Sequence, residues 1–143
     1  MAFPVEAVLS QDQTGAATDN LKKQWAGLIR YVPELESCAQ GTINVDLKHP
    51  ILVLNPHRTV PPFEWQPGQV EGFGILKIKF EWPFDTEPFQ AWVYLAHQSH
   101  HRYNLLRAEV ITKEIPSLRG KTQFTSEERR CRLHYPDFCG GIV

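Results

Sequence analysis

The chain has 143 residues, of which 42% are hydrophobic and 22% are charged, and its formal net charge is −1. This size and composition predict one globular domain with a hydrophobic core and argue against a disordered chain. The small net charge gives no general attraction to nucleic acid or to a membrane surface, and no apolar run approaches the length of a membrane span.

The first residues and the cysteines indicate a reduced, cytoplasmic protein. The stretch from Met1 to Glu6 lacks a basic region followed by an apolar one, so we expect no signal peptide. The cysteines at positions 38, 131 and 139 fit neither a disulfide framework nor a paired zinc motif. We expect no nucleic-acid or membrane partner, and the oligomeric state stays open.

The chain opens with a short apolar run at 5–9, which predicts the first strand. A polar loop at 10–18 follows and contains one glycine, Gly15. Its backbone N–H groups could approach a phosphate, although a plain connection is the simpler interpretation.

A helix is predicted from 20 to 31, capped by Thr18 or Asp19 and ended by Pro33. Its apolar residues recur at helical spacing and form one stripe. The stripe consists of Leu21, Trp25, Leu28 and Ile29.

The stretch 41–47 has the alternation of a half-buried strand. Its polar positions share one face and carry a hydroxyl, an amide and a carboxylate: Thr42, Asn44 and Asp46. Such oxygen ligands suit Mg²⁺ and a phosphate-bearing partner. Gly41 precedes the strand, where the backbone can approach a ligand closely. An ordinary edge strand with a solvated polar face is the alternative.

The stretch 55–68 contains four prolines and a glycine and predicts an irregular binding loop or lid. His57 and Arg58 could meet an anion there, and Phe63 and Trp65 could cover a flat ring. Simple packing of a surface loop is the alternative.

Further strands are predicted at 51–54, 69–82 and 89–96, and Gly72 within the second of these suggests a bulge or a close backbone approach. One helix among many short strands favours a compact β-barrel with helical decoration. Near the C-terminus we expect a short charged segment capped by Thr125 or Ser126, a closing strand at 131–135 and a tail at 136–143. The whole chain is predicted to form one barrel domain.

Three histidines fall within five residues, His97, His100 and His101. They invite a zinc interpretation, but their spacing matches no recognised ligand pattern. A polar loop whose histidines contact an anionic ligand is the favoured hypothesis.

Glu109 lies within an apolar stretch at 105–111 that predicts another strand. A carboxylate in such a setting can be partly buried, with a raised pKa, and can act as a general base. A salt bridge is equally compatible, and its possible partners are Arg107, Lys113 and Arg119.

The sequence resembles the archaeal-type CTP-dependent riboflavin kinases. The most specific match is 41–47, which is similar to the family's Gly-Thr-Leu-Asn-Val-x-Leu strand; weaker matches follow in family order at 71–74, 99–101, 109–111 and 118–119. The resemblance implies a six-stranded cradle-loop barrel and Mg²⁺-dependent transfer of a phosphoryl group from CTP to riboflavin.

The resemblance also implies roles for individual residues. Thr42 and Asn44 would bind Mg²⁺ beside the nucleotide phosphates, with Gly15 and Gly41 also contacting the nucleotide. Glu109 would lie near the reacting hydroxyl, and two further ligand contacts are expected from His100 and His101. The first loop keeps one glycine where the family has several, so a non-catalytic or differently active ligand-binding barrel is the alternative.

Overall fold

The computed structural model describes residues 2–10, 16–97, 105–115, 118 and 123–143, and its architecture is mostly β. The strands are β1 (Ala2–Leu9), β2 (Ile43–Leu47), β3 (Ile51–Val53), β4 (Arg58–Gln66), β5 (Gln69–Glu81), β6 (Phe89–Ala96), β7 (Arg107–Ile111), β8 (Arg130–Pro136) and β9 (Gly140–Ile142). The helices are α1 (Ala16–Tyr31) and the short α2 (Ser126–Arg129). Neither has the length and apolar character that a membrane-spanning helix requires.

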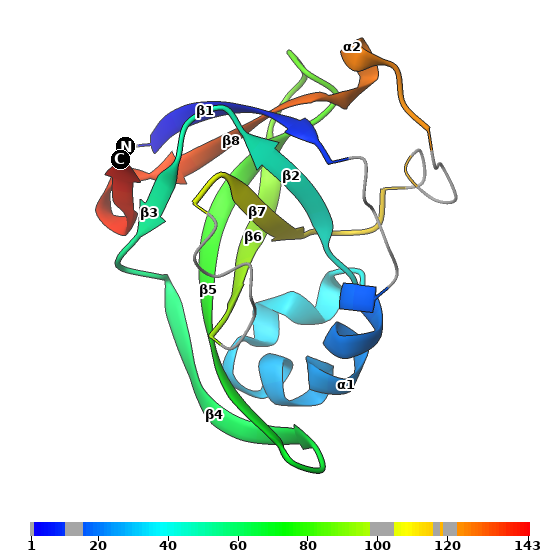
Figure 1. The fold of residues 1–143 in the computed structure, drawn as a ribbon, viewed down its shortest axis with the longest axis vertical. Helices are drawn as coiled ribbons and strands as arrows, with labels where there is room; N and C mark the ends of the chain where they lie inside the picture. Colours follow the sequence, from blue (N-terminus) through cyan, green and yellow to red (C-terminus); the bar gives the residue numbers. More distant parts are fainter. Residues whose placement is uncertain (1, 11–15, 98–104, 116–117, 119–122) are drawn as a thin grey trace.

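Six strands form a closed ring within one antiparallel sheet. The sheet runs in the order β4-β5-β6-β7-β2-β1-β8, and β8 also pairs with β5. That last pairing is the seam of the ring, where Phe80 lies opposite Leu133 and Glu81 lies opposite Arg132. Figure 1 shows the ring, with α1 packed beside it and the long β4–β5 hairpin extending past it.

Strand alternation divides the apolar side chains between two cores. On β5, Leu76, Ile78 and Phe80 are buried while Lys77 and Lys79 are exposed, as the sequence predicts. Residues of this kind from all six ring strands pack together inside the ring. A second core lies between the outer face of the sheet and α1, and its helical members include Leu21, Trp25 and Leu28.

The residues predicted as an irregular loop are instead mostly strand. β4 lies at the edge of the sheet and pairs with β5, and its register shifts between Val60 and Phe63, where Pro61 and Pro62 stand. An edge strand tolerates prolines because their missing N–H groups can face away from the ladder. The Phe63 ring packs against α1 at Gly27, where an added Cβ would collide with the ring.

Close backbone approach is confirmed at Gly72, where an added Cβ would lie 3.1 Å from the Val60 carbonyl oxygen.

Thr125, one of the two caps predicted for the charged segment near the C-terminus, caps α2 through a capping box with Glu128. The stretch predicted as a tail contains β9, which pairs with β3.

Candidate functional site

Two of the residues that the sequence singles out, Asn44 and Glu109, are direct neighbours in the sheet. Asn44 on β2 and Glu109 on β7 are Cα partners in the antiparallel ladder, and each side chain is 8% exposed. Asp46 lies opposite Arg107 in the same ladder. Because side chains on opposed residues share a face, the polar face of β2 meets a polar face of β7.

The remaining predicted site residues are only partly described. Gly41 and Thr42 immediately precede β2 and are half-buried. Gly15, His100 and His101 lie outside the described residues. His97 is exposed, and its backbone N–H donates to the Gly72 carbonyl oxygen at 3.1 Å.

Glu109 is buried, and few neighbouring groups stabilise the charged form of its carboxylate. Within the described ranges the carboxylate makes no hydrogen bond and no ion pair. Burial raises the pKa of Glu109 to about 7; the charge of Arg107 opposes this shift, and the charge of Glu71 adds to it. A carboxyl group with such a pKa exchanges protons near neutral pH.

Sequence reasoning missed three buried polar residues in this region: Tyr94 and Glu71, which interact electrostatically with Glu109, and Gln24, which contacts Tyr94. The register of β6 against β7, with Val93 opposite Val110, brings Tyr94 beside Glu109. The Tyr94 hydroxyl donates to Gln24 Oε1 of α1 at 2.5 Å. Burial, followed by the charges of Glu109 and Glu71, raises the pKa of Tyr94, so its hydroxyl stays protonated.

We call the five residues Asn44, Glu109, Tyr94, Gln24 and Glu71 the Glu109 site. A signal for Gln24 existed in the sequence, because it stands three residues after Leu21 and four before Leu28, on the buried stripe of α1. The site joins β2, β5, β6 and β7 to α1, so it combines a proton acceptor with neighbouring polar groups on a rigid sheet.

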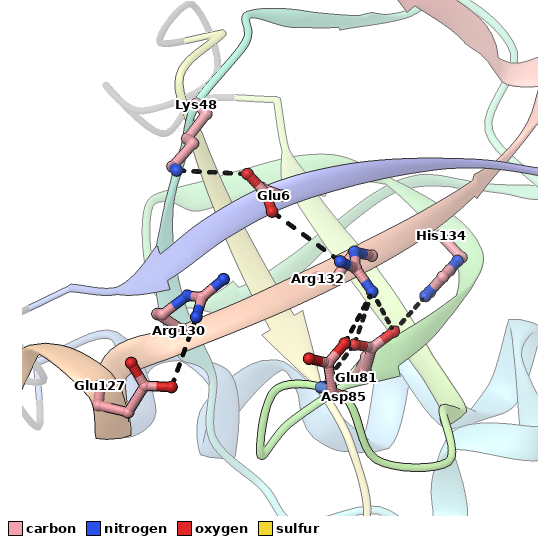
Figure 2. Close-up of polar contacts among 8 residues, drawn as sticks. All are labelled: Glu6, Lys48, Glu81, Asp85, Glu127, Arg130, Arg132 and His134. Carbon is pink, nitrogen blue, oxygen red and sulfur yellow. Dashed lines mark hydrogen bonds and ion pairs between the residues drawn. The ribbon is translucent and has the colours of Figure 1, made fainter.

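A second group of charges lies across the seam of the ring (Figure 2). Glu81 on β5 is 4% exposed and accepts hydrogen bonds from Arg132 Nη1 at 2.9 Å and from the Asp85 backbone N–H at 2.8 Å. His134 Nε2 lies 2.9 Å from its other oxygen. Arg132 also lies 3.9 Å from Glu6 on β1. We call these five residues the Glu81 cluster.

A surface hollow of about 210 Å³ is lined in part by Glu6 of the Glu81 cluster, and neither Asn44 nor Glu109 lines it. Its wall includes Phe84 and Arg130, whose guanidinium carbon lies 3.9 Å from the Phe84 ring centroid. Its rim carries charges of both signs, among them Glu6 and Lys48 at 3.3 Å from each other. These charges are already paired with one another.

Metal ligation and relatives give no further guide to the site. Among the described residues, no group of three or more His, Cys, Asp and Glu side chains is placed to hold a metal ion. Neither the models of known protein families nor the curated proteins gave a match to this sequence.

Proposed function

We propose that the protein transfers a phosphoryl group from a nucleotide such as CTP to the hydroxyl group of a small acceptor such as riboflavin, with Mg²⁺. The observation that carries the proposal is the juxtaposition of Asn44 with the buried Glu109 in the β2–β7 ladder. The ring of six strands, with a helix between β1 and β2, supports a cradle-loop barrel.

Glu109 is assigned the role of general base. With a pKa of about 7 it is partly ionised at neutral pH and is matched to accept a hydroxyl proton. The acceptor oxygen would form a bond to the terminal phosphorus while the bond to the bridging oxygen breaks and the nucleoside diphosphate leaves. The hydroxyl proton would pass to the Glu109 carboxylate.

Thr42 and Asn44 would hold the metal ion. A hydroxyl oxygen and an amide oxygen are hard ligands, so this donor set fits Mg²⁺, which keeps several waters and binds phosphate oxygens. Bound there, Mg²⁺ would neutralise charge on the phosphates. Asn44 would orient the phosphates towards the acceptor hydroxyl, which would lie beside Glu109.

Incubation with riboflavin, CTP and Mg²⁺ tests the proposal, with FMN formation as the measurement. We expect Glu109→Gln to lower kcat by about 100-fold or more, since positioned proton transfer contributes 10²–10⁴-fold. Glu127→Gln is the control, because the Glu127 side chain is 79% exposed and lies on α2, outside the Glu109 site. Absence of FMN with every nucleotide tried would remove the activity, and full activity of Asn44→Ala would remove the proposed metal site.

A ligand-binding domain without catalysis is the second candidate. It is favoured by the position of the hollow, which does not include Asn44 or Glu109, and by the large apolar side chains that fill the space under α1. Thermal-shift measurements with nucleotides and flavins separate the two candidates. Stabilisation by a flavin without any turnover supports the binding domain.

A further inference from the structure

Arg107 is a cation on the same face of the sheet as the proposed base. It lies on β7, two residues before Glu109. Its partner in the ladder, Asp46, lies two residues after Asn44 on β2. Because side chains alternate along a strand, these four side chains share one face, and the Cα atoms of Arg107 and Glu109 are about 7 Å apart. A long cationic side chain therefore begins next to the proposed base.

Contacts made by Ser10 bring the Arg107 guanidinium towards Asn44. Arg107 Nη2 donates to the Ser10 hydroxyl oxygen at 2.7 Å, and the Ser10 backbone N–H donates to the Asn44 carbonyl oxygen at 2.9 Å. Ser10 is 3% exposed, so this bridge lies out of contact with water. The charge of Arg107 also acts on Glu109, where it opposes the rise in pKa that burial causes. One cation thus lies close to both residues on which the proposed transfer depends.

An ion pair with Asp46 explains the position of Arg107 only in part. Arg107 Nη2 lies 3.5 Å from Asp46 Oδ1, and the Asp46 side chain is 46% exposed whereas that of Arg107 is 13% exposed. A long pair with an exposed carboxylate is screened by water and contributes little to stability. Because this contact is weak, an anion with more charge can take the place of the Asp46 carboxylate.

We propose that Arg107 binds the terminal phosphoryl group of the nucleotide, the group that is transferred; this inference rests on the phosphotransfer proposed above. The planar guanidinium presents paired N–H donors that match two oxygens of a phosphate. During transfer the negative charge is spread over the non-bridging oxygens of the phosphoryl group, and a guanidinium bound to them stabilises that charge. Arg107 therefore selects a nucleoside triphosphate over a diphosphate.

Isothermal titration calorimetry with Mg²⁺ and either CTP or CDP, without an acceptor, tests the inference by binding alone. We expect the wild type to bind CTP about 10-fold or more tightly than CDP, because CDP lacks the phosphate that accepts the charge-assisted hydrogen bonds. Arg107→Met should lose most of this preference and keep the wild-type affinity for CDP. Arg107→Lys, which keeps the charge but not the paired donors, should lie between the two.

Arg30→Met is the matched control, because Arg30 is an exposed arginine on α1, outside the Glu109 site, and this variant should keep the wild-type preference. Circular dichroism verifies that each variant is folded. An unchanged preference in folded Arg107→Met, or in Arg107→Lys if only that variant folds, overturns the inference. A wild type that binds CTP no better than CDP also overturns it.

FMN formation, measured in parallel, separates this inference from the proposed function. If the wild type forms FMN and the preference for CTP does not depend on Arg107, the phosphotransfer stands and the role of Arg107 is wrong. If no FMN forms but the preference for CTP is lost in Arg107→Met, the phosphotransfer is wrong and the phosphate site stands. A wild type that binds no nucleotide overturns both.

Discussion

Glu81 and Glu109 are both buried carboxylates on the ring, with exposed fractions of 4% and 8%, yet their surroundings differ completely. Burial alone would raise the pKa of Glu81, but hydrogen bonds from His134, the Asp85 N–H and Arg132 outweigh it and lower that pKa. Around Glu109 burial prevails, and the pKa rises to about 7. Burial therefore does not decide the state of a carboxylate; the donors within reach of it do.

The positions of Glu81 and Glu109 in the sheet agree with the opposite directions of their pKa shifts. Glu81 lies where β5 meets β8, so its bonds to Arg132 hold the seam of the ring together. Glu109 lies between β2 and β6 within the continuous sheet, where the ladder is already complete. The Glu81 carboxylate therefore links two strands at the seam, whereas the Glu109 carboxylate has no such role in the sheet.

The largest expected effect on stability is that of Glu81→Gln. The change leaves the Arg132 guanidinium with only its longer ion pairs, to Asp85 at 3.7 Å and to Glu6 at 3.9 Å. Removing one member of a buried ion pair costs about 3–5 kcal/mol. Because Arg132 is itself 25% exposed, we expect the lower end, about 3 kcal/mol, from urea unfolding at pH 7. Glu127→Gln should change stability by less than about 0.5 kcal/mol. Equal effects of the two variants would mean that the Glu81 cluster does not hold the seam.

Glu109→Gln should instead increase the free energy of unfolding, by an amount that depends on pH because the pKa of Glu109 is raised. The unfolded chain has the ordinary value of 4.5 and the folded chain about 7, so the folded state binds the proton more tightly. This contribution is fully present below about pH 4.5 and is lost as the pH rises towards 7 and above. We expect Glu109→Gln to equal the wild type at pH 4 and to be more stable by up to about 3 kcal/mol at pH 8.

The measurement is urea unfolding of Glu109→Gln and of the wild type from pH 4 to pH 8, which gives the difference in their free energies of unfolding at each pH. A difference that stays constant with pH would show that Glu109 titrates normally. It would remove the contrast with Glu81, and with it the argument for a general base.

A smaller effect is expected where the Glu109 site meets α1. Tyr94→Phe removes the donor to Gln24, which is 2% exposed, and an unsatisfied buried polar group costs about 1–3 kcal/mol. We expect a loss of about 1–2 kcal/mol by thermal or urea unfolding. Tyr31→Phe is the control, because Tyr31 is 40% exposed. If Gln24→Met costs the same and the double variant costs no more, the hydrogen bond is the cause.

Local patterns predicted much of this architecture because they depend on near neighbours. The alternation at 76–80 and the helical stripe of α1 appear as expected, and both Asn44 and Glu109 stood out from their own surroundings. Which residues face each other depends instead on strand pairing. Nothing local brings Glu81 next to Arg132, 51 residues later, until β5 pairs with β8.

Two other features could not be predicted from the sequence, each for a different physical reason. The prolines of β4 indicate a loop by their composition, and only the edge position in the sheet makes a strand possible there. Gln24 was visible as a polar residue on a buried stripe, but its partner Tyr94 belongs to a strand 70 residues away. The sequence thus identified two members of the Glu109 site, Asn44 and Glu109, while their grouping with the other members needs the fold.

The smallest effect is expected at the outer edge of the Glu81 cluster, with Glu6→Gln. Glu6 lies 3.3 Å from Lys48 and 3.9 Å from Arg132, and its side chain is 44% exposed. Water screens such pairs, which contribute about 0–1 kcal/mol, so we expect a loss of at most about 0.5 kcal/mol by urea unfolding. A loss as large as that of Glu81→Gln would mean that the cluster acts as one cooperative network reaching β1. A small loss would show that most of the stabilisation by the cluster comes from the Glu81–Arg132 ion pair. Removal from water strengthens the attraction between these two charges.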